Sequence, residues 1–150
     1  MQRITPFFWF EKNMSEILEY YQDIFSDFKI ISRNKMSETP SGDVEIVEVE
    51  IFGNRMSWMT AGPYFKFNEA ISFVISTDGQ EETDYYWQKL TADGGTESQC
   101  GWCKDKYGVS WQVVPKQLGE AMAQGDSELA KYASTQMLQM KKIIIKDLYK

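Results

Sequence analysis

Histidine is absent from the 150 residues of this chain. Imidazole is the side chain that most often moves protons near neutral pH, and it is the commonest nitrogen ligand of protein-bound metals. Its absence excludes Ser-His and Cys-His nucleophile pairs and every metal centre that is built on imidazole. We therefore expect no bound metal and no other cofactor.

Long apolar runs are also missing. No run approaches the roughly 18 residues that a membrane-spanning helix needs, and the N-terminus lacks the basic and apolar regions of a signal peptide. Only two cysteines are present, too few for a disulfide framework. These features predict a cytoplasmic protein with reduced thiols and without a membrane partner.

Basic residues are outnumbered, with 16 Lys and Arg against 22 Asp and Glu and a net charge of −6. That balance argues against a general nucleic-acid binder and against a reader of anionic membranes. Lysines gather only near the C-terminus, at Lys141, Lys142, Lys146 and Lys150. We interpret this group as a solvated tail.

The two cysteines form a C-x-x-C motif, Cys100-Gly101-Trp102-Cys103. A redox site of this kind normally opens a helix, whose N-terminus stabilises the thiolate. The segment here is predicted to be extended, and in a strand residues i and i+3 point to opposite faces. We therefore expect two ordinary cysteines that are not paired with each other.

Aromatic residues are abundant, at 15% of the chain. They suit a thick core or a pocket for a flat apolar ligand. A chain of 150 residues is most simply a single domain that buries about 70% of its unfolded surface.

The first module, residues 1–63, is predicted to begin with an apolar strand, Ile4–Phe10. Asn13 is expected to cap a helix, with Glu16 at the third position. Strands follow at Lys29–Met36, Val44–Phe52 and Arg55–Ala61, the last two joined by a Gly53-Asn54 turn. The buried stripe of the helix is predicted to comprise Met14, Ile17, Leu18, Tyr21 and Phe25.

The second module, residues 68–115, follows the same order. A strand, Ala70–Thr77, precedes a helix, Gln80–Thr91, which Asp78 is expected to cap while Glu81 bonds back. Further strands end at Val114. Thr83, Tyr86, Trp87 and Leu90 form the predicted buried stripe of this helix.

The two modules repeat each other in register. A shift of 65 residues places Phe8 on Phe73, Asn13 on Asp78, and the pair Tyr20-Tyr21 on Tyr85-Tyr86. We interpret this as a duplicated strand–helix–three-strand unit.

The remaining residues, 117–150, are predicted to be a helical extension. Helices are expected at Leu118–Gln124, ending at Gly125, and at Ser127–Met140, capped by Asp126, with a short strand at Ile143–Ile145. The predicted fold class is therefore α+β, with duplicated βαβββ modules and a helical C-terminal extension.

Several stretches together resemble the PhnB-like proteins of the vicinal oxygen chelate superfamily, which includes glyoxalases, bleomycin-resistance proteins and dioxygenases. They are FFWFEKNMSEILEYYQDIF, GPYFKFNEAISFVI, the CGW of 100–102, DKYGVSWQVVP and MLQMKKI. The resemblance covers the chain from Ile4 to about Ile143. It implies two modules that form a cupped sheet, usually paired in a homodimer. Such sequences often carry the description 3-demethylubiquinone-9 3-methyltransferase.

The resemblance also indicates where metal-using relatives hold their ion. Those positions correspond to Pro6, Ser57, Ile71 and Gln112, of which only Gln112 could coordinate a metal, and weakly. The methyltransferase description has no support in the residues. No G-x-G turn is present, and a nucleoside cofactor needs a glycine-rich turn between strand and helix.

Alternation along the strands predicts the lining of the cup. Phe8, Phe10, Phe73 and Trp102 are expected to line a concave space, with Ser57, Met59 and Gln112 at its floor. Gln112 has two interpretations, a hydrogen-bonding group for a ligand or a polar residue at a sheet edge. Glu48 and Glu50 alternate with valines and are predicted to lie on a solvent-exposed face.

The sequence thus predicts a protein that binds a small molecule, with aromatic compounds as candidates, and that works without metal. One alternative is an enzyme of this superfamily, a lyase, a dioxygenase or the methyltransferase of the description. The other is a drug-sequestering resistance protein. An enzyme should show a strongly perturbed pKa in its cup, whereas a binder should show aromatic walls. Open strand edges, together with the resemblance, favour a homodimer.

Overall fold

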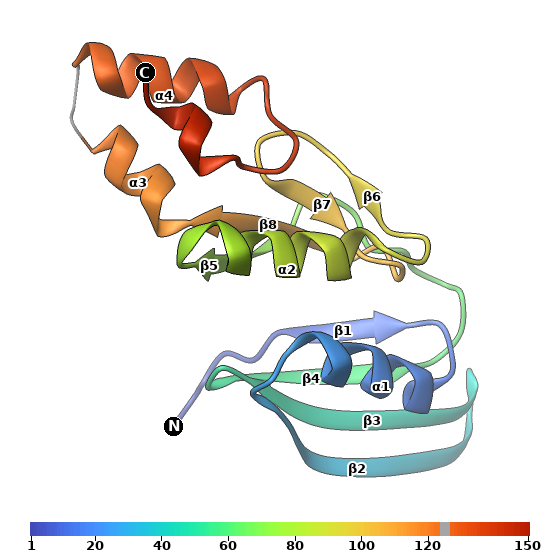
Figure 1. Cartoon of the computed structure of the whole chain (residues 1–150). Helices are drawn as coiled ribbons and strands as arrows, with labels where there is room; N and C mark the ends of the chain where they lie inside the picture. The colour runs from blue at the N-terminus through green and yellow to red at the C-terminus, as the bar shows by residue number, and fades with distance from the viewer. Residues whose placement is uncertain (124–126) are drawn as a thin grey trace. The chain divides into compact units, whose positions relative to one another are not determined.

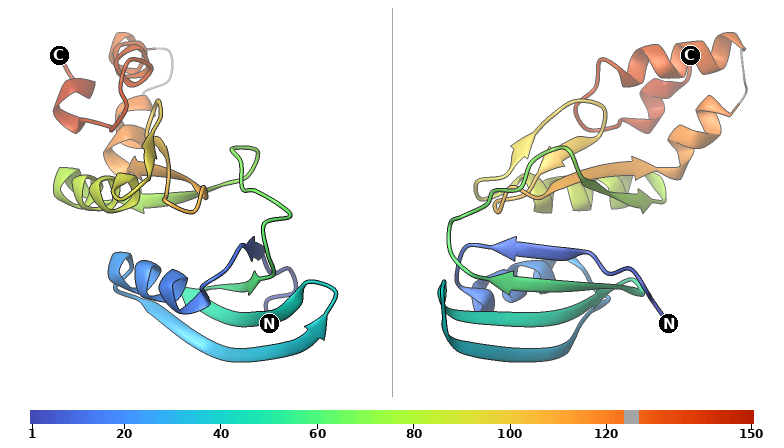
Figure 2. Two further views of the ribbon diagram at one scale, coloured as in Figure 1. Left: turned by 90° about the vertical axis from the view of Figure 1, so that its right-hand side faces the viewer. Right: turned by 180° about the vertical axis from the view of Figure 1, so that it is seen from behind.

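The structure, a computed structural model, describes residues 1–123 and 127–150. The chain divides into two compact units, Met1–Lys66 and Phe67–Lys150 (Figures 1 and 2). The expected cap at Asp126 and the helix end at Gln124 and Gly125 lie outside the described residues. Within the described ranges, no helix is long and apolar enough to cross a membrane.

Unit 1 is a four-stranded sheet with one helix. Its elements are β1 (Phe7–Phe10), α1 (Met14–Ile24), β2 (Phe28–Thr39), β3 (Gly42–Ile51) and β4 (Asn54–Thr60). The strand order is β1-β4-β3-β2, in which β1 runs parallel to β4 and the other pairs are antiparallel.

The turn between β3 and β4 lies one residue earlier than expected. Phe52 and Gly53 occupy it, both at positive φ (48° and 78°). Two consecutive positive φ values are what a two-residue hairpin turn between twisted strands requires. Asn54 already belongs to β4, and its side-chain amide donates to the carbonyls of Ile51 and Phe52.

Helix α1 covers one face of this sheet (Figure 2) and confirms the predicted stripe. All five predicted side chains are buried. The Tyr21 ring lies 4.9 Å from that of Trp58 on β4, which is 1% exposed. Asn13 does stand at the N-cap position, but at a φ of 63° its side chain makes no capping hydrogen bond, so the expected cap bond was wrong.

Unit 2 repeats the arrangement. Its elements are β5 (Ser72–Thr77), α2 (Gly79–Thr91), β6 (Thr96–Glu97), β7 (Trp102–Lys104) and β8 (Ser110–Pro115), in the order β5-β8-β7-β6. β5 runs parallel to β8, and the other pairs are antiparallel. Each unit is therefore a βαβββ module with the same strand order, which confirms the predicted α+β fold.

The tyrosine pairs show how closely the modules correspond. The rings of Tyr20 and Tyr21 are 4.9 Å apart at 71°, and those of Tyr85 and Tyr86 are 5.0 Å apart at 79°. In each pair the second tyrosine is buried. The repeat seen in the sequence is thus a repeat in packing as well.

The buried stripe of α2 is also confirmed, with Thr83, Tyr86, Trp87 and Leu90 all buried. The capping at its N-terminus differs from the prediction. The Asp78 carboxylate accepts from Lys116 Nζ (2.7 Å) and Gln117 Nε2 (3.0 Å) instead of capping the helix. Glu82, and not Glu81, accepts the Asp78 backbone N–H at 2.6 Å. Lys116 and then Gln117 lower the pKa of Asp78 by hydrogen bonding to its charged form.

The C-terminal extension contains α3 (Lys116–Met122), α4 (Glu128–Met137) and the 3-10 helix η1 (Ile145–Leu148). Ser127 caps α4 by accepting the Ala130 N–H at 3.2 Å. These elements lie together in Figure 1. They share a small core that consists of Leu118, Ala121, Ala133, Ile143 and Leu148.

The predicted strand at Ile143–Ile145 is absent because a side chain on α2 takes the place of a partner strand. The Gln80 amide donates to the Ile143 carbonyl (3.0 Å) and accepts from the Ile145 N–H (2.8 Å). One primary amide thus satisfies two backbone groups, and the chain then enters η1.

Cys100 also departs from the prediction, because it lies in a turn and not in a strand. Cys100 and Gly101 have φ values of 58° and 83°, and their N–H groups donate to the carbonyls of Met140 and Lys141, each at 2.8 Å. A Cβ on Gly101 would lie 2.9 Å from the Val113 carbonyl oxygen. The turn therefore needs glycine, and it fastens the C-terminal extension to the sheet of the second module.

Cys103, by contrast, is a buried residue of β7. Burial, followed by the charges of Asp105 and Glu97, raises the pKa of its thiol to about 12. The thiol is therefore protonated and unreactive near neutral pH, because the thiolate is the nucleophile.

We predict that a disulfide exchange reagent at mildly alkaline pH titrates one thiol in the native protein and two after denaturation without reductant. Cys100→Ser should abolish the native reaction and leave one thiol in the denatured chain. Two fast thiols in the native wild-type protein would contradict the burial of Cys103.

We also predict that Gln80→Ala lowers the free energy of unfolding by about 1–3 kcal/mol, because two backbone groups lose their partner. Urea denaturation followed by circular dichroism measures the change. Gln88→Ala, the same substitution at an exposed position of α2, is the matched control and should change stability by less than about 0.5 kcal/mol. Equal effects of the two substitutions would contradict the role given to Gln80.

Candidate functional site

The face of sheet 1 that α1 leaves uncovered is the candidate site, and we call it the open face. Side chains alternate along each strand. Since Phe8 pairs with Trp58 on the helix side, the neighbouring pairs Phe7–Ser57 and Trp9–Met59 fall on the open face.

Strand pairing arranges this face in three rows. The ion-pair row comprises Arg55, Glu50 and Lys29. The polar row comprises Phe7, Ser57, Glu48 and Ser32. The apolar row comprises Trp9, Met59 and Ile46, and it ends at Asn34 on β2.

The ion-pair row satisfies its own charges. Lys29 Nζ lies 3.5 Å from one Glu50 carboxylate oxygen, and Arg55 Nε lies 3.5 Å from the other. Lys29 also lies 3.7 Å from Asp27. The two cations of this row are therefore already engaged.

The polar row holds one uncompensated charge. The Glu48 carboxylate is exposed, and among the residues that the structure describes it has no ion-pair partner. Its direct cross-strand neighbours are the half-buried Ser57 and Ser32. The row thus presents a carboxylate between two hydroxyl groups.

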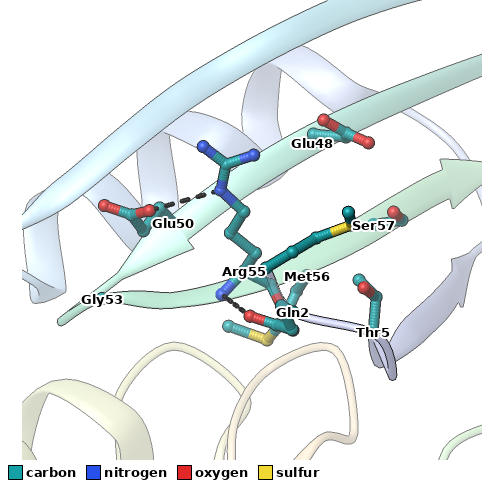
Figure 3. A pocket seen from close by; sticks show the side chains of 9 residues that line it. Gln2, Thr5, Glu48, Glu50, Gly53, Arg55, Met56 and Ser57 are labelled. Carbon is teal, nitrogen blue, oxygen red and sulfur yellow. Dashed lines mark hydrogen bonds and ion pairs between the residues drawn. The ribbon is translucent and has the colours of Figure 1, made fainter.

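A hollow of about 530 Å³ lies over the polar and ion-pair rows (Figure 3). Figure 3 shows Glu48 and Glu50 on the same strand, with the Arg55 guanidinium turned toward Glu50. Gln2 fixes the rim, since its side-chain amide donates to the Arg55 carbonyl (2.9 Å) and accepts the Arg55 N–H (3.3 Å). The hollow is lined by Met1, Gln2, Thr5, Glu48, Glu50, Gly53, Arg55, Met56 and Ser57.

Three aromatic rings form a corner at the other end of the face, and we call Trp9, Tyr64 and Phe65 the aromatic corner. The Phe65 ring lies 5.0 Å from Trp9 at 89°, and the Tyr64 ring lies 6.3 Å from it at 86°. Trp9 is oriented by a hydrogen bond from its Nε1 to the Gly62 carbonyl at 2.9 Å. Tyr64 is 65% and Phe65 67% exposed.

The predicted site residues of unit 1 separate onto two faces. Ser57 and Met59 lie on the open face. Phe8 and Phe10 do not, because both are buried on the side that α1 covers, where the Phe10 ring lies 6.3 Å from Tyr21. The prediction that Phe8 and Phe10 line the cup was therefore wrong, because the side-chain alternation is shifted by one residue. Phe7 and Trp9 lie on the open face instead.

The same separation occurs in unit 2. Gln112 and Trp102 are cross-strand partners and share one face. Gln112 lies on the inner strand β8 and donates to Ser72 Oγ at 2.9 Å, so it is not a sheet-edge residue. Phe73 shares the opposite face with Thr77, whose hydroxyl lies 2.7 Å from that of Thr83 on α2. Phe73 was therefore also assigned to the wrong face.

Two features of this face were missed in the sequence, the aromatic corner and the setting of Glu48. Tyr64 and Phe65 lie between the predicted modules 1–63 and 68–115, and no site residue was predicted there. Glu48 was expected on a solvent-exposed face, and it is exposed, but it lines a hollow. The strand FFWF could not have identified this face, because it is apolar on both faces and carries no period-two signal.

The residues present do not fit the metal that the superfamily uses. Pro6 and Ile71 precede strands and offer no side-chain donor, while Ser57 and Gln112 offer only neutral oxygens. Across the described ranges, no three His, Cys, Asp or Glu residues are grouped so that they could hold an ion.

A nucleoside cofactor does not fit the strand–helix turn of unit 2 either. Such a cofactor would use the free N–H groups at the start of the helix. Here the Asp78 N–H donates to Glu82, and the Gly79 N–H donates to Gln117 Oε1 at 3.1 Å. Side chains of the chain itself therefore occupy this helix end.

Comparison with known proteins places this geometry in a family. Residues 2–114 match the family model described as 3-demethylubiquinone-9 3-methyltransferase. No curated protein matches the chain.

Three solved structures are similar. A PhnB protein from Bacillus cereus, which carries the same methyltransferase description, is 26% identical with a TM-score of 0.66, over 76% of this chain and 99% of that one. Protein PA1353 from Pseudomonas aeruginosa is 17% identical with a TM-score of 0.61, over 77% and 98%. The fosfomycin resistance protein FosX from Listeria monocytogenes is 14% identical with a TM-score of 0.54, over 76% and 93%.

The family match ends at residue 114, one residue before β8 ends, so the C-terminal extension lies beyond it. The matched part contains both βαβββ modules, and the structures that it resembles have the glyoxalase-like fold. The chain therefore belongs to the PhnB-like family, the family described as 3-demethylubiquinone-9 3-methyltransferase, within the vicinal oxygen chelate superfamily.

Proposed function

We propose that the open face of unit 1 binds a small molecule with a flat apolar body, without the help of a metal. The observation that carries this proposal is the aromatic corner. Tyr64 and Phe65 keep about two thirds of their surface exposed beside the half-buried Trp9. Exposed aromatic groups gathered at one place are typical of binding sites.

The apolar row continues this surface across the sheet. Met59 and Ile46 follow Trp9 on successive strands, and both are half-buried. Covering them with a ligand removes apolar surface from water, which is worth about 25 cal/mol per Å². A ligand on this row would stack or pack edge-on against the rings of the corner.

The polar row would then fix the orientation of the ligand. Ser57 and Thr5 offer hydroxyl groups, and Glu48 offers a carboxylate, at the edge of the hollow. The hollow of about 530 Å³ over the polar and ion-pair rows has room for the polar end of a ligand whose flat body covers the neighbouring apolar row. A mostly apolar surface with a few convergent polar groups is the usual composition of such sites.

Binding without catalysis is the simpler interpretation of this chemistry. The chain has no histidine, and its residues do not fit the metal of the superfamily. One structure of FosX is a complex with Mn(II) and a phosphonic acid, whereas in the described part of this chain no three His, Cys, Asp or Glu residues are grouped so that they could hold a metal ion. Sequestration of a drug-like molecule in the cytoplasm would need only the aromatic corner and the polar row.

We predict that Phe65→Ala weakens the binding of 1-naphthalenemethanol, a neutral flat probe, by about threefold to tenfold. Isothermal titration calorimetry measures the dissociation constant. Tyr149→Ala removes an exposed aromatic ring, 43% exposed, from the C-terminal extension and is the matched control. Failure of the probe to bind, or equal loss in both variants, would refute the proposed site.

We further propose that the protein forms a homodimer through the outer edge of β2. This strand of 12 residues lies at the edge of its sheet and exposes Ile30 (41%), Ile31 (40%) and Met36 (51%). A long strand edge that exposes apolar side chains invites pairing with another strand. A twofold axis would let the same edge serve both copies.

We therefore predict that light scattering at micromolar concentration gives twice the 17.5 kDa mass of the chain, and that Met36→Lys gives the single mass. Leu138→Lys, at a residue of the extension that is 65% exposed, should leave the dimer intact. A single mass for the wild-type protein would refute the dimer. Loss of the dimer only in Leu138→Lys would move the interface to the C-terminal helices.

A further inference from the structure

We infer that the ligand of the open face is an organic cation, a flat aromatic body that carries an amine or quaternary ammonium group, and that Glu48 binds the charge. This inference rests on the proposed function and adds the sign of the ligand's charge. Three features carry it: the charge distribution over the rows, the spacing from the aromatic corner, and the preference of aromatic rings for cations.

The charges on the open face are unequally satisfied. Glu50 forms ion pairs with both Lys29 and Arg55. Lys29 forms a second ion pair, with Asp27. Glu48 lies one pleat away on the same strand, and within the described chain no cation pairs with it.

The position of Glu48 strengthens its attraction for a cation. The carboxylate stands beside the apolar row, since Ile46 is the next residue of β3 on this face. A nearby apolar surface, once a ligand covers it, excludes water and lowers the local dielectric constant. An ionic contact is worth more there than in open solvent.

The spacing suits one molecule that reaches both ends. Across the sheet, Trp9 and Glu48 are separated by two strand spacings of about 4.8 Å each. Along the strands they are separated by two residues, or about 6.6 Å. Their backbone positions are therefore roughly 12 Å apart. Both side chains extend over the face, so a two-ring aromatic with a short cationic arm could contact Trp9 and Glu48 together.

The aromatic corner favours the same sign. The faces of aromatic rings carry negative charge density, and tryptophan and tyrosine attract ammonium groups most strongly. An anion would meet no such partner. The Arg55 guanidinium contacts Glu50 through its Nε at 3.5 Å, so a phosphonate or carboxylate at this position would compete with the Glu50 carboxylate.

The experiment compares three naphthalene probes by isothermal titration calorimetry. They are (1-naphthylmethyl)trimethylammonium, 1-naphthalenemethanol and 1-naphthaleneacetate, which share the ring system and differ in charge. We expect the cation to bind about tenfold more tightly than the neutral probe, and the anion to bind most weakly. Raising the salt concentration from about 50 to about 300 mM should weaken only the cation, because salt screens charge.

Glu48→Gln should remove the tenfold preference for the cation and leave the neutral probe unchanged. Glu48 is exposed, so the variant should fold, and circular dichroism checks this. Glu19→Gln makes the same change in net charge on α1, which covers the other face of the sheet, and serves as the matched control. It should leave all three dissociation constants unchanged.

The outcomes separate the inference from the proposed function. Equal binding of the three probes, weakened by Phe65→Ala, would overturn the charge assignment while the aromatic site stands. Tightest binding of the anion would also overturn it. Binding of none of the probes would overturn both proposals. A cation preference that survives Glu48→Gln would show that Glu48 is not its source.

Discussion

The pairing of β1 with β4 is the constraint on which the rest of unit 1 depends. Placing Phe8 opposite Trp58 puts both rings beneath α1, where Tyr21 and Phe10 pack against Trp58 at 4.9 and 5.5 Å. Because side chains alternate, that burial forces Phe7, Trp9, Ser57 and Met59 onto the other face. The hydrophobic core and the candidate site are therefore set by one register, and a slip of one residue would exchange them.

The second unit has the same module, but its helix also bonds the C-terminal extension. Its helix α2 supplies, besides a buried stripe, a set of polar side chains that hold the C-terminal extension. Gln80 bonds Ile143 and Ile145, and the Asp84 carboxylate pairs with Lys142 at 2.8 Å. Together with the Cys100-Gly101 turn, these contacts join residues that lie beyond the family match to the module that precedes them.

The proposed function rests on groups that recognise a ligand. Burial keeps the Cys103 thiol protonated, with a pKa of about 12, so the C-x-x-C motif does not provide a nucleophile at that position. The open face of unit 1 instead brings together rings, hydroxyl groups and the Glu48 carboxylate, which has no ion-pair partner among the described residues. These groups can orient and hold a flat molecule. The shared fold does not transfer the chemistry of FosX, because a fold hosts many functions and the site decides which.

The sequence alone determined the class of fold, the repeat and the two helical stripes. Residues at a helical period predict which side of a helix is buried. The two predicted stripes together contain nine residues, including Phe25 just after α1, and all nine are buried. Tertiary structure decided which face of each sheet is covered, and so which alternate residues form the site. Phe8, Phe10 and Phe73 were misplaced because a strand that is apolar on both faces, as FFWF is, carries no period-two signal to distinguish them. The partners of Gln80 and Asp78 likewise lie far along the chain, at Ile143, Ile145 and Lys116. Spacing in the sequence cannot specify such contacts.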